Sequence, residues 1–284
     1  MDEKKLADVR RAFARKVVET ARIKDVRFEG AFAEVHREDF LPPGPWRVPT
    51  ETYGSENTPD DNPVHVYQDR PVGIMPAKGL YNGQPHFLAF LISLTRPAEG
   101  DRFVHVGAGT GYYTAIIARL VGASGTVQAI EFEPELAERA RRNLSALPNV
   151  SVVAGDGTAI PLDAADAILV NAGATRPEAV WLDALKDGGR LVLPLTVPFT
   201  MPEGHQMTFG SIFLIERSSG EFTARWASTT GIYPCAGRDE TSEAALRAAF
   251  AAGGAERVSR LYRTDDIPDE RCWVRGQGWS LAYH

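Results

Sequence analysis

Apolar residues in the middle of the chain follow two alternating patterns. Runs rich in β-branched and aliphatic residues predict strands at 102–106, 126–131, 150–153, 165–171, 189–195, 209–216 and 222–232. Apolar residues at helical spacing predict helices at 84–95, 112–121, 133–146 and 177–186. Pro134 and Glu135 favour a helix start at the third of these helices, and Arg141 and Arg142 favour its end. Alternating strands and helices predict an α/β fold with a doubly wound, mainly parallel sheet.

The two ends of the chain have other patterns. Apolar residues near helical spacing, including Phe13 and Phe32, predict helices in the N-terminal part. Five prolines between positions 42 and 59 then predict a long loop without regular structure. Near the C-terminus we expect a helix at 243–251, followed by a tail at 272–281 that contains two tryptophans. We interpret this tail as an added edge strand or clasp, and a lid over a peptide groove is the alternative.

These changes of pattern divide the chain into three parts. Residues 1–63 form an N-terminal helical segment and a Pro-rich loop. Residues 64–236 form the doubly wound domain, and residues 237–284 form a C-terminal extension.

The first central strand leads into a glycine-rich turn. Residues 103–106 are followed by Gly107, Gly109 and Gly111, and a helix-like segment begins directly afterwards. Glycine allows positive φ and a close approach to a ligand, and the free N–H groups of the helix start face that ligand. Twenty positions after Gly111 the next strand ends in Glu131, and a carboxylate there suits the two hydroxyls of a ribose. We therefore expect a nucleoside cofactor.

The spacing of the glycines distinguishes between the possible nucleoside cofactors. A dinucleotide fingerprint needs a small residue where Tyr112 stands, and a Walker loop needs a Gly-Lys-Ser/Thr tripeptide that the chain lacks. The G-x-G-x-G spacing is typical of S-adenosylmethionine-dependent methyltransferases. By itself it also fits an ordinary glycine-rich turn, and the position of Glu131 favours the cofactor site. The cofactor-binding residues predicted from this turn are Gly107, Ala108, Gly109, Thr110, Gly111 and Tyr112.

Two further strand ends carry candidate site residues. Asp156 follows the third central strand, where its carboxylate suits an adenine amine and Gly157 leaves room for the flat ring. A plain Asp-Gly turn is the alternative reading. Asn171 follows the fourth strand and is assigned to the methyl-transfer side of the cofactor site, with a simple turn as the alternative. Since ligands of such sheets bind outside the carboxyl ends of the strands, Gly107, Glu131, Asp156 and Asn171 are expected to converge on one crevice.

The composition argues against two classes of binding partner, nucleic acids and membranes. The net charge of −6 and pI of about 5.6, without a sustained Lys/Arg run, argue against nucleic acid as the main ligand. No apolar run is long enough to span a bilayer, so no membrane partner is expected. Cys235 and Cys272 are far apart and predict reduced thiols in a cytoplasmic protein. We expect no metal site, and the sequence does not indicate an oligomeric state.

Several blocks in one order resemble the protein-L-isoaspartate O-methyltransferase family. The blocks are 31–40, 82–85, 104–111, Glu131, 155–157, 165–172, 188–194, 220–222 and 232–234. The resemblance covers roughly residues 25 to 236. It implies a Rossmann-like class I methyltransferase fold with a closing antiparallel hairpin, and S-adenosyl-L-methionine as the methyl donor. It also implies a protein or peptide carboxylate as the acceptor, typically the α-carboxyl of an L-isoaspartyl residue.

The chain departs from the family pattern at its substrate loop. The family typically has Thr-Ile-Ser there, and Gly83 replaces the serine that is taken as the active-site residue. Either the Asn82 amide or the Gly83 N–H is then the expected donor to the acceptor, so we assign both residues as catalytic. His105 stands where the family usually has Glu and is read as a hydrogen-bonded strand residue. His86, just after Pro85, is read as a surface or capping residue rather than a base.

A carboxylate acceptor needs no catalytic base, which agrees with the lack of an obvious base in the sequence. A carboxylate has a reference pKa of about 4, so it is already ionised at neutral pH and needs only donors that hold it. An amine or hydroxyl acceptor usually needs a base. Three functions are considered: an isoaspartyl carboxyl methyltransferase, a methyltransferase of the same architecture with another acceptor, and a non-catalytic S-adenosylmethionine-binding module.

Overall fold

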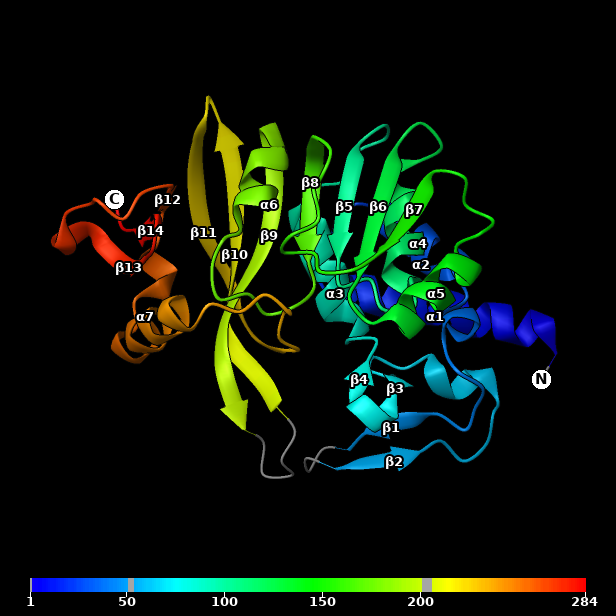
Figure 1. The fold of residues 1–284 in the computed structure, drawn as a ribbon. Coiled ribbons are helices and arrows are strands. Elements are labelled where there is room, and N and C mark those ends of the chain that lie inside the picture. Colours follow the sequence, from blue (N-terminus) through cyan, green and yellow to red (C-terminus); the bar gives the residue numbers. More distant parts are fainter. Residues whose placement is uncertain (1, 51–53, 201–205) are drawn as a thin grey trace. The chain divides into compact units, whose positions relative to one another are not determined.

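The computed structural model describes residues 2–50, 54–200 and 206–284. It divides into two compact units (Figure 1). Unit 1 comprises Met1–Gly100 and Ala108–Ala154, and unit 2 comprises Asp101–Gly107 and Gly155–His284. The boundary between the units therefore falls inside the predicted glycine motif, between Gly107 and Ala108.

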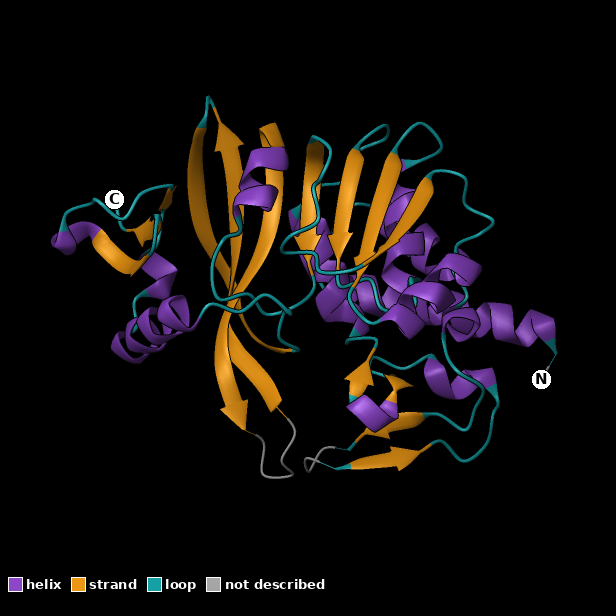
Figure 2. Ribbon diagram, in the orientation of Figure 1, coloured by secondary structure: helices purple, strands orange, loops and turns teal. Residues whose placement is uncertain are grey.

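Unit 1 combines helices with a parallel strand pair and two small hairpins (Figure 2). Its helices are α1 (Glu3–Thr20), α2 (Arg27–Glu34), α3 (Pro85–Leu94), α4 (Tyr112–Val121) and α5 (Pro134–Asn143), with 3-10 turns at Arg37–Phe40, Pro63–Val66 and Pro76–Lys78. Strands β6 (Thr126–Glu131) and β7 (Val150–Ala154) pair in parallel, in the register Val127↔Val150. Helix α1 begins where the Asp2 side chain accepts the Lys4 N–H, which satisfies one of the free donors of the first turn.

The proline-rich segment of unit 1 contains regular structure, so the prediction of an unstructured loop was wrong there. Strands β1 (Arg47–Pro49) and β2 (Ser55–Asn57) form an antiparallel hairpin. Pro49 is the last residue of β1, which belongs to a two-stranded hairpin. The N–H that proline lacks is therefore not needed for a hydrogen bond inside a larger sheet. A second hairpin, β3 (Gly73–Met75) with β4 (Leu80–Tyr81), leads directly into the predicted substrate loop.

Unit 2 is built on a sheet that is parallel at one side and antiparallel at the other. Its strand order is β13-β14-β12-β11-β10-β9-β8-β5. The parallel strands are β5 (Arg102–Val106), β8 (Ala165–Val170) and β9 (Leu185–Thr200). The antiparallel strands are β10 (Gln206–Ser218), β11 (Glu221–Ile232), β12 (Arg260–Tyr262), β13 (Cys272–Gly276) and β14 (Trp279–Ala282). The expected closing hairpin is thus β10–β11.

Burial explains why the central strands of unit 2 read as continuous apolar runs. Residues 167–170 of β8 and 191–193 of β9 are fully buried, as expected for strands covered on both faces. Helix α6 (Ala179–Ala184) is shorter than the helix predicted at 177–186, and β9 begins at Leu185 rather than at the predicted residue 189. The start of β9 forms an irregularity in the β8–β9 register, because the pair Ala165↔Leu185 is followed by Ala167↔Arg190.

The C-terminal extension continues this sheet. Helix α7 (Glu240–Ala252) starts at Asp239, whose side chain accepts the Ser242 N–H. Strands β12, β14 and β13 then add to the edge of β11, as the edge-strand interpretation predicted. Trp273 and Trp279 are both buried in this extension. Among the described residues, no helix is long and apolar enough to cross a membrane.

Candidate functional site

The glycine turn of unit 1 is tied to the acidic residue that follows the next strand. Glu131 accepts the Gly109 N–H through Oε2 at 2.6 Å and the Glu133 N–H through Oε1 at 3.0 Å. Gly109 and Gly111 both have positive φ, at 58° and 95°. A Cβ on Gly111 would stand 2.7 Å from Leu144 Cδ1, so this position needs glycine for both its backbone angle and its space. The predicted pairing of the glycine motif with Glu131 is therefore present.

Glu131 retains capacity to bind a ligand. Its side chain is 6% exposed, and burial raises the pKa of its carboxyl, an effect that the N–H groups of Glu133 and Gly109 oppose. The N–H groups of Gly109 and Glu133 bond to separate oxygens of this carboxylate, and the Phe132 N–H also contributes a hydrogen bond to it. An ionised carboxylate offers about four lone-pair sites, so at least one hydroxyl donor, such as one of a ribose, can still be accommodated.

An exposed aromatic ring beside Glu131 went unrecognised in the sequence. Phe132 is 55% exposed, which is unusual for a large apolar residue in a folded unit. It directly follows the carboxylate, where a flat face is available to the ring of a nucleoside base. Its position directly after Glu131, the acidic residue at the end of the strand, is the sequence feature that could have identified it.

The side chain of Tyr112 is buried in the interior of unit 1. It is only 1% exposed, and its ring contacts the rings of Phe32, Phe40 and Tyr113. It is the first residue of α4, so its backbone alone faces the turn. Ala108 and Thr110 are likewise buried. Main-chain groups, rather than these side chains, are what the turn can present to a ligand.

Unit 2 brings together Gly107 and Asn171, the residues that follow β5 and β8. The Asn171 N–H donates to Val106 O at 2.8 Å, and Asn171 Nδ2 donates to Gly107 O at 3.4 Å. Gly107 has a φ of 79°, and a Cβ there would stand 2.9 Å from Asn171 O. The close approach of the two strand ends thus requires glycine at this position.

The Asp156 turn lies beside the same strand end. A Cβ on Gly157 would overlap Val106 Cγ1, and Gly157 O accepts the Trp181 Nε1–H at 2.8 Å. Asp156 Oδ1 accepts the Thr158 N–H at 2.9 Å and its hydroxyl at 2.7 Å. These bonds are those of an Asp-Gly turn, and Oδ2 takes no part in them. Gly107, Asn171 and the Asp156 turn therefore lie close together within unit 2, and their convergence with Glu131 of unit 1 stays a prediction.

A segment of the C-terminal part borders this turn, which the sequence alone did not indicate. Gly173 exchanges backbone hydrogen bonds with Tyr233 O at 2.6 Å and Cys235 N at 2.8 Å. A Cβ on Gly237 would stand 3.3 Å from Asp156 Oδ2, so residues 233–237 run close to the Asp156 and Asn171 loops. Burial raises the pKa of Cys235 to about 12, so this thiol stays protonated.

The substrate loop of unit 1 is held from two sides. The Asn82 N–H donates to Val72 O, and Asn82 Oδ1 accepts the Val72 N–H, both at 2.9 Å. Gly83 has a φ of 79°, and its carbonyl accepts the Tyr113 hydroxyl at 3.3 Å. A Cβ on Gly83 would stand 2.7 Å from Leu88 Cδ2. Asn82 and Gly83 therefore lie next to each other in a fixed loop, with glycine required by the backbone.

The two histidines near the predicted site have structural surroundings. The His86 N–H donates to Asp69 Oδ1 at 2.9 Å, and His86 Nδ1 lies 2.6 Å from Asp69 Oδ2. Asp69 therefore caps helix α3 and orients the imidazole, in line with the capping interpretation. His105 is fully buried in β5, and burial lowers its pKa to about 4, so it remains neutral. It is a residue of the sheet interior, as expected.

The fold and the site define a class. Parallel strands with an antiparallel continuation make up a class I methyltransferase fold, and the glycine turn is bonded to the acidic end of the next strand. A solved structure named protein-L-isoaspartate O-methyltransferase matches with a TM-score of 0.62 at 20% identity, over 95% of this chain and 87% of that one. A putative enzyme of this name from Plasmodium falciparum, in complex with S-adenosyl-L-homocysteine, matches with a TM-score of 0.59 at 19% identity, over 80% and 97%.

Sequence comparison identifies the family. The model of the family Protein-L-isoaspartate(D-aspartate) O-methyltransferase (PCMT) matches residues 10–208. The protein-L-isoaspartate O-methyltransferase of Ignicoccus hospitalis is 39% identical over 153 residues, 52% of this chain and 70% of that protein. Enzyme 1 of this name from Archaeoglobus fulgidus is 36% identical over 167 residues, 57% of this chain and 72% of that protein. The chain therefore belongs to the PCMT family of S-adenosylmethionine-dependent methyltransferases.

Proposed function

We propose that this chain transfers the methyl group of S-adenosylmethionine to the α-carboxylate of L-isoaspartyl residues in proteins or peptides. The observation that carries the proposal is the family match over residues 10–208, which includes both the substrate loop and the cofactor turn. The relatives from Ignicoccus and Archaeoglobus carry the name of this activity. The acidic overall charge of −6 agrees with a protein acceptor rather than a nucleic acid.

The residues around the glycine turn fit adenosine. Glu131 would accept a ribose hydroxyl through its remaining lone pairs, and Phe132 would cover one face of the adenine. Backbone groups of 107–112 would border the methionine part. Asp156 Oδ2, with Gly157 beside it, would accept the adenine amine, and Asn171 would line the methyl-transfer side. These assignments are part of the proposal.

The acceptor chemistry agrees with the groups in the substrate loop. Bound S-adenosylmethionine supplies an electrophilic methyl group: its S–CH₃ bond breaks as the acceptor's O–CH₃ bond forms. An isoaspartyl carboxylate is ionised at neutral pH, so the chain needs to orient it rather than to take a proton from it. Asn82 and Gly83 supply amide donors for that purpose. The carboxylate loses its charge as the ester forms, and S-adenosylhomocysteine leaves as a neutral thioether.

A second candidate is the same transfer to another acceptor, such as a modified peptide or a small acid. Gly83 favours it, because the backbone at this position excludes the serine of the family pattern. The extension beyond residue 236 favours it too, since its first residue, Gly237, lies beside the Asp156 turn. The two free cysteines, Cys235 and Cys272, support our placement of the chain in the reducing cytoplasm.

Methyl transfer to matched peptides tests the proposal. We expect label from S-[methyl-³H]adenosylmethionine to appear as base-labile methanol from an isoaspartyl peptide and not from the aspartyl peptide of the same sequence. The variant Glu131→Ala, which loses the proposed ribose acceptor, should bind S-adenosylhomocysteine about 10- to 100-fold more weakly. Transfer to neither peptide, with S-adenosylhomocysteine still bound by the wild type, would contradict the proposed acceptor and favour the second candidate.

A further inference from the structure

Arg37 is a fully buried cation that contacts the substrate loop. It belongs to the 3-10 turn Arg37–Phe40 of unit 1 and has no exposed surface. Nη1 donates to Val66 O at 2.6 Å and to Gln68 O at 2.9 Å, and Nη2 donates to Arg70 O at 2.7 Å and to Asn82 Oδ1 at 3.1 Å. Four of the five guanidinium donors are therefore used, all by uncharged oxygens. One of those oxygens belongs to the residue that we assigned to the acceptor.

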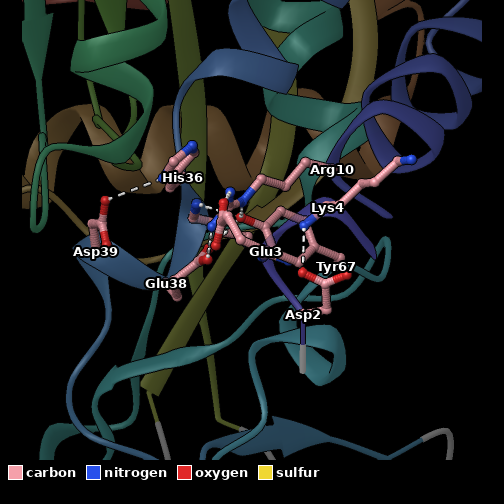
Figure 3. A network of polar contacts seen from close by, with 9 residues as sticks. Asp2, Glu3, Lys4, Arg10, His36, Glu38, Asp39 and Tyr67 are labelled. Carbon is pink, nitrogen blue, oxygen red and sulfur yellow. Dashed lines mark hydrogen bonds and ion pairs between the residues drawn. The ribbon is translucent and has the colours of Figure 1, made fainter. Parts of the chain in front are cut away.

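The charge of Arg37 is not neutralised by a carboxylate in the described parts of the chain. Its neighbour Glu38 is engaged elsewhere: it accepts from Arg10 Nη2 at 2.6 Å and from the Tyr67 hydroxyl (Figure 3). Burial and the bond to Glu38 raise the pKa of Tyr67, so this phenol stays protonated and keeps Glu38 occupied. A buried guanidinium without a counter-ion creates a positive potential around it that water screens poorly. Asn82, bonded to that guanidinium, lies within this field.

The side-chain amide of Asn82 can have only one orientation. Oδ1 accepts from two donors, the Val72 N–H at 2.9 Å and Arg37 Nη2 at 3.1 Å. A flipped amide would place its NH₂ group against both donors, which leaves Oδ1 as the only possible acceptor there. Nδ2 is then the remaining donor of the amide, and it is buried without a hydrogen-bond partner among the described residues. Because an unsatisfied buried donor is costly, such a group is expected to meet a ligand.

We propose that Arg37 is a positioning residue that holds the Asn82 amide with Nδ2 toward the acceptor, and that its buried charge makes this site prefer an anionic carboxylate over a neutral amide. The inference rests on the proposed function and deepens it. It assigns recognition of the acceptor to Arg37 and Asn82, which would replace the serine of the family pattern. Gly83 cannot supply a side-chain donor, whereas Asn82 has one that is oriented and unpaired. The carboxylate would receive the Nδ2–H and would lie in the field of Arg37.

The variant Asn82→Asp tests the donor with little change in shape. It puts an oxygen where Nδ2 stands and gives Arg37 a carboxylate partner, so the loop is expected to remain folded. We expect kcat/KM for an isoaspartyl peptide to fall about 100-fold at neutral pH, because a charged hydrogen bond is lost and two carboxylates repel. The Kd for S-adenosylhomocysteine should not change. Activity of Asn82→Asp relative to wild type should rise on acidification, since the introduced carboxyl donates a hydrogen bond again once it is protonated.

The variant Arg37→Lys tests the positioning role. A lysine keeps the charge but not the planar fork that reaches Asn82 and three carbonyls at once. We expect KM for the isoaspartyl peptide to rise about 10-fold or more, while kcat changes less. Arg10→Lys is the matched control, because Arg10 is also a buried arginine of unit 1 but bonds to Glu3, Glu38 and Tyr67 rather than to Asn82. It should leave the KM for the peptide unchanged.

The charge preference is measured with two peptides. The wild type should bind an isoaspartyl peptide with a free α-carboxylate at least about 10-fold more tightly than its α-carboxamide analogue, in the presence of S-adenosylhomocysteine. Asn82→Asp should lose this preference. If Asn82→Asp keeps wild-type kcat/KM and a wild-type pH profile, the inference is wrong although the proposed function stands. If the wild type neither methylates nor binds the isoaspartyl peptide, both are overturned.

Discussion

At the scale of single residues, the backbone at Gly83 explains why a serine is absent from the substrate loop. Its φ of 79° lies in the left-handed region, where a side chain is strained, and a Cβ would stand 2.7 Å from Leu88 Cδ2. The loop is held in this conformation by bonds on both sides, from Tyr113 to Gly83 O and between Asn82 and Val72. A side-chain donor for the acceptor must therefore come from a neighbouring position.

This gives a prediction for Gly83→Ser, the change toward the family pattern. We expect it to lower the free energy of unfolding by about 1–2 kcal/mol from backbone strain, with a further loss from the Leu88 contact, and not to raise methyl transfer. Gly220→Ser is the control, because Gly220 has a φ of 80° and nothing lies within 4 Å of its Cβ position. Urea denaturation compares the two. Equal losses, or a gain in activity by Gly83→Ser, would show that the loop accommodates the hydroxyl.

At the scale of elements, the C-terminal strands complete an edge of the unit 2 sheet. Trp273 on β13 contacts the rings of Phe213 and Phe250 at centroid distances of 5.5 Å each, and its Nε1–H donates to Gly253 O at 2.9 Å. It thereby joins β13 to strand β10 and helix α7. A tryptophan that is buried with its N–H satisfied is an anchor of the fold rather than a free recognition side chain.

Trp273→Ala separates the clasp from the lid interpretation. We expect a loss of about 3–5 kcal/mol in the free energy of unfolding, which is typical for removing a buried aromatic side chain, and no change in KM for an isoaspartyl peptide. Trp226→Ala serves for comparison, since Trp226 on β11 is only partly buried, and it should cost less. A raised KM with unchanged stability would instead support a lid.

At the scale of the whole molecule, ligand binding should stabilise the folded chain by mass action. At a concentration about 100 times its Kd, S-adenosylhomocysteine is expected to add about 2.7 kcal/mol to the free energy of unfolding. The melting temperature should rise accordingly in wild type and rise much less in Glu131→Ala at the same concentration. Homocysteine, which lacks the adenosine, should have no effect. An equal rise in Glu131→Ala would remove Glu131 from the proposed site.

The sequence by itself was sufficient for most elements of the central part of the chain and for the cofactor class. The predicted bounds of the strands at 102–106 and 126–131 match those in the structure. The hydrophobic pattern that predicts a strand depends only on residues close together in the sequence. The spacing predicted that Glu131 shares one cofactor site with the glycine motif, and the structure adds the hydrogen bond from the Gly109 N–H to its carboxylate. The family followed from several such blocks in one order.

Only the tertiary structure decided which side chains are available. The side chain of Tyr112 is surrounded by aromatic rings, which leaves its backbone for the predicted cofactor site, and Pro49 closes a strand in a segment expected to be irregular. The bond from Arg37 to Asn82 joins positions 45 residues apart, and residues 233–237 reach the Asp156 and Asn171 loops. Periodicity reports short-range order, whereas burial and such distant contacts arise from how the elements pack. The cofactor class was therefore readable from the sequence, and the groups that would hold the acceptor were not.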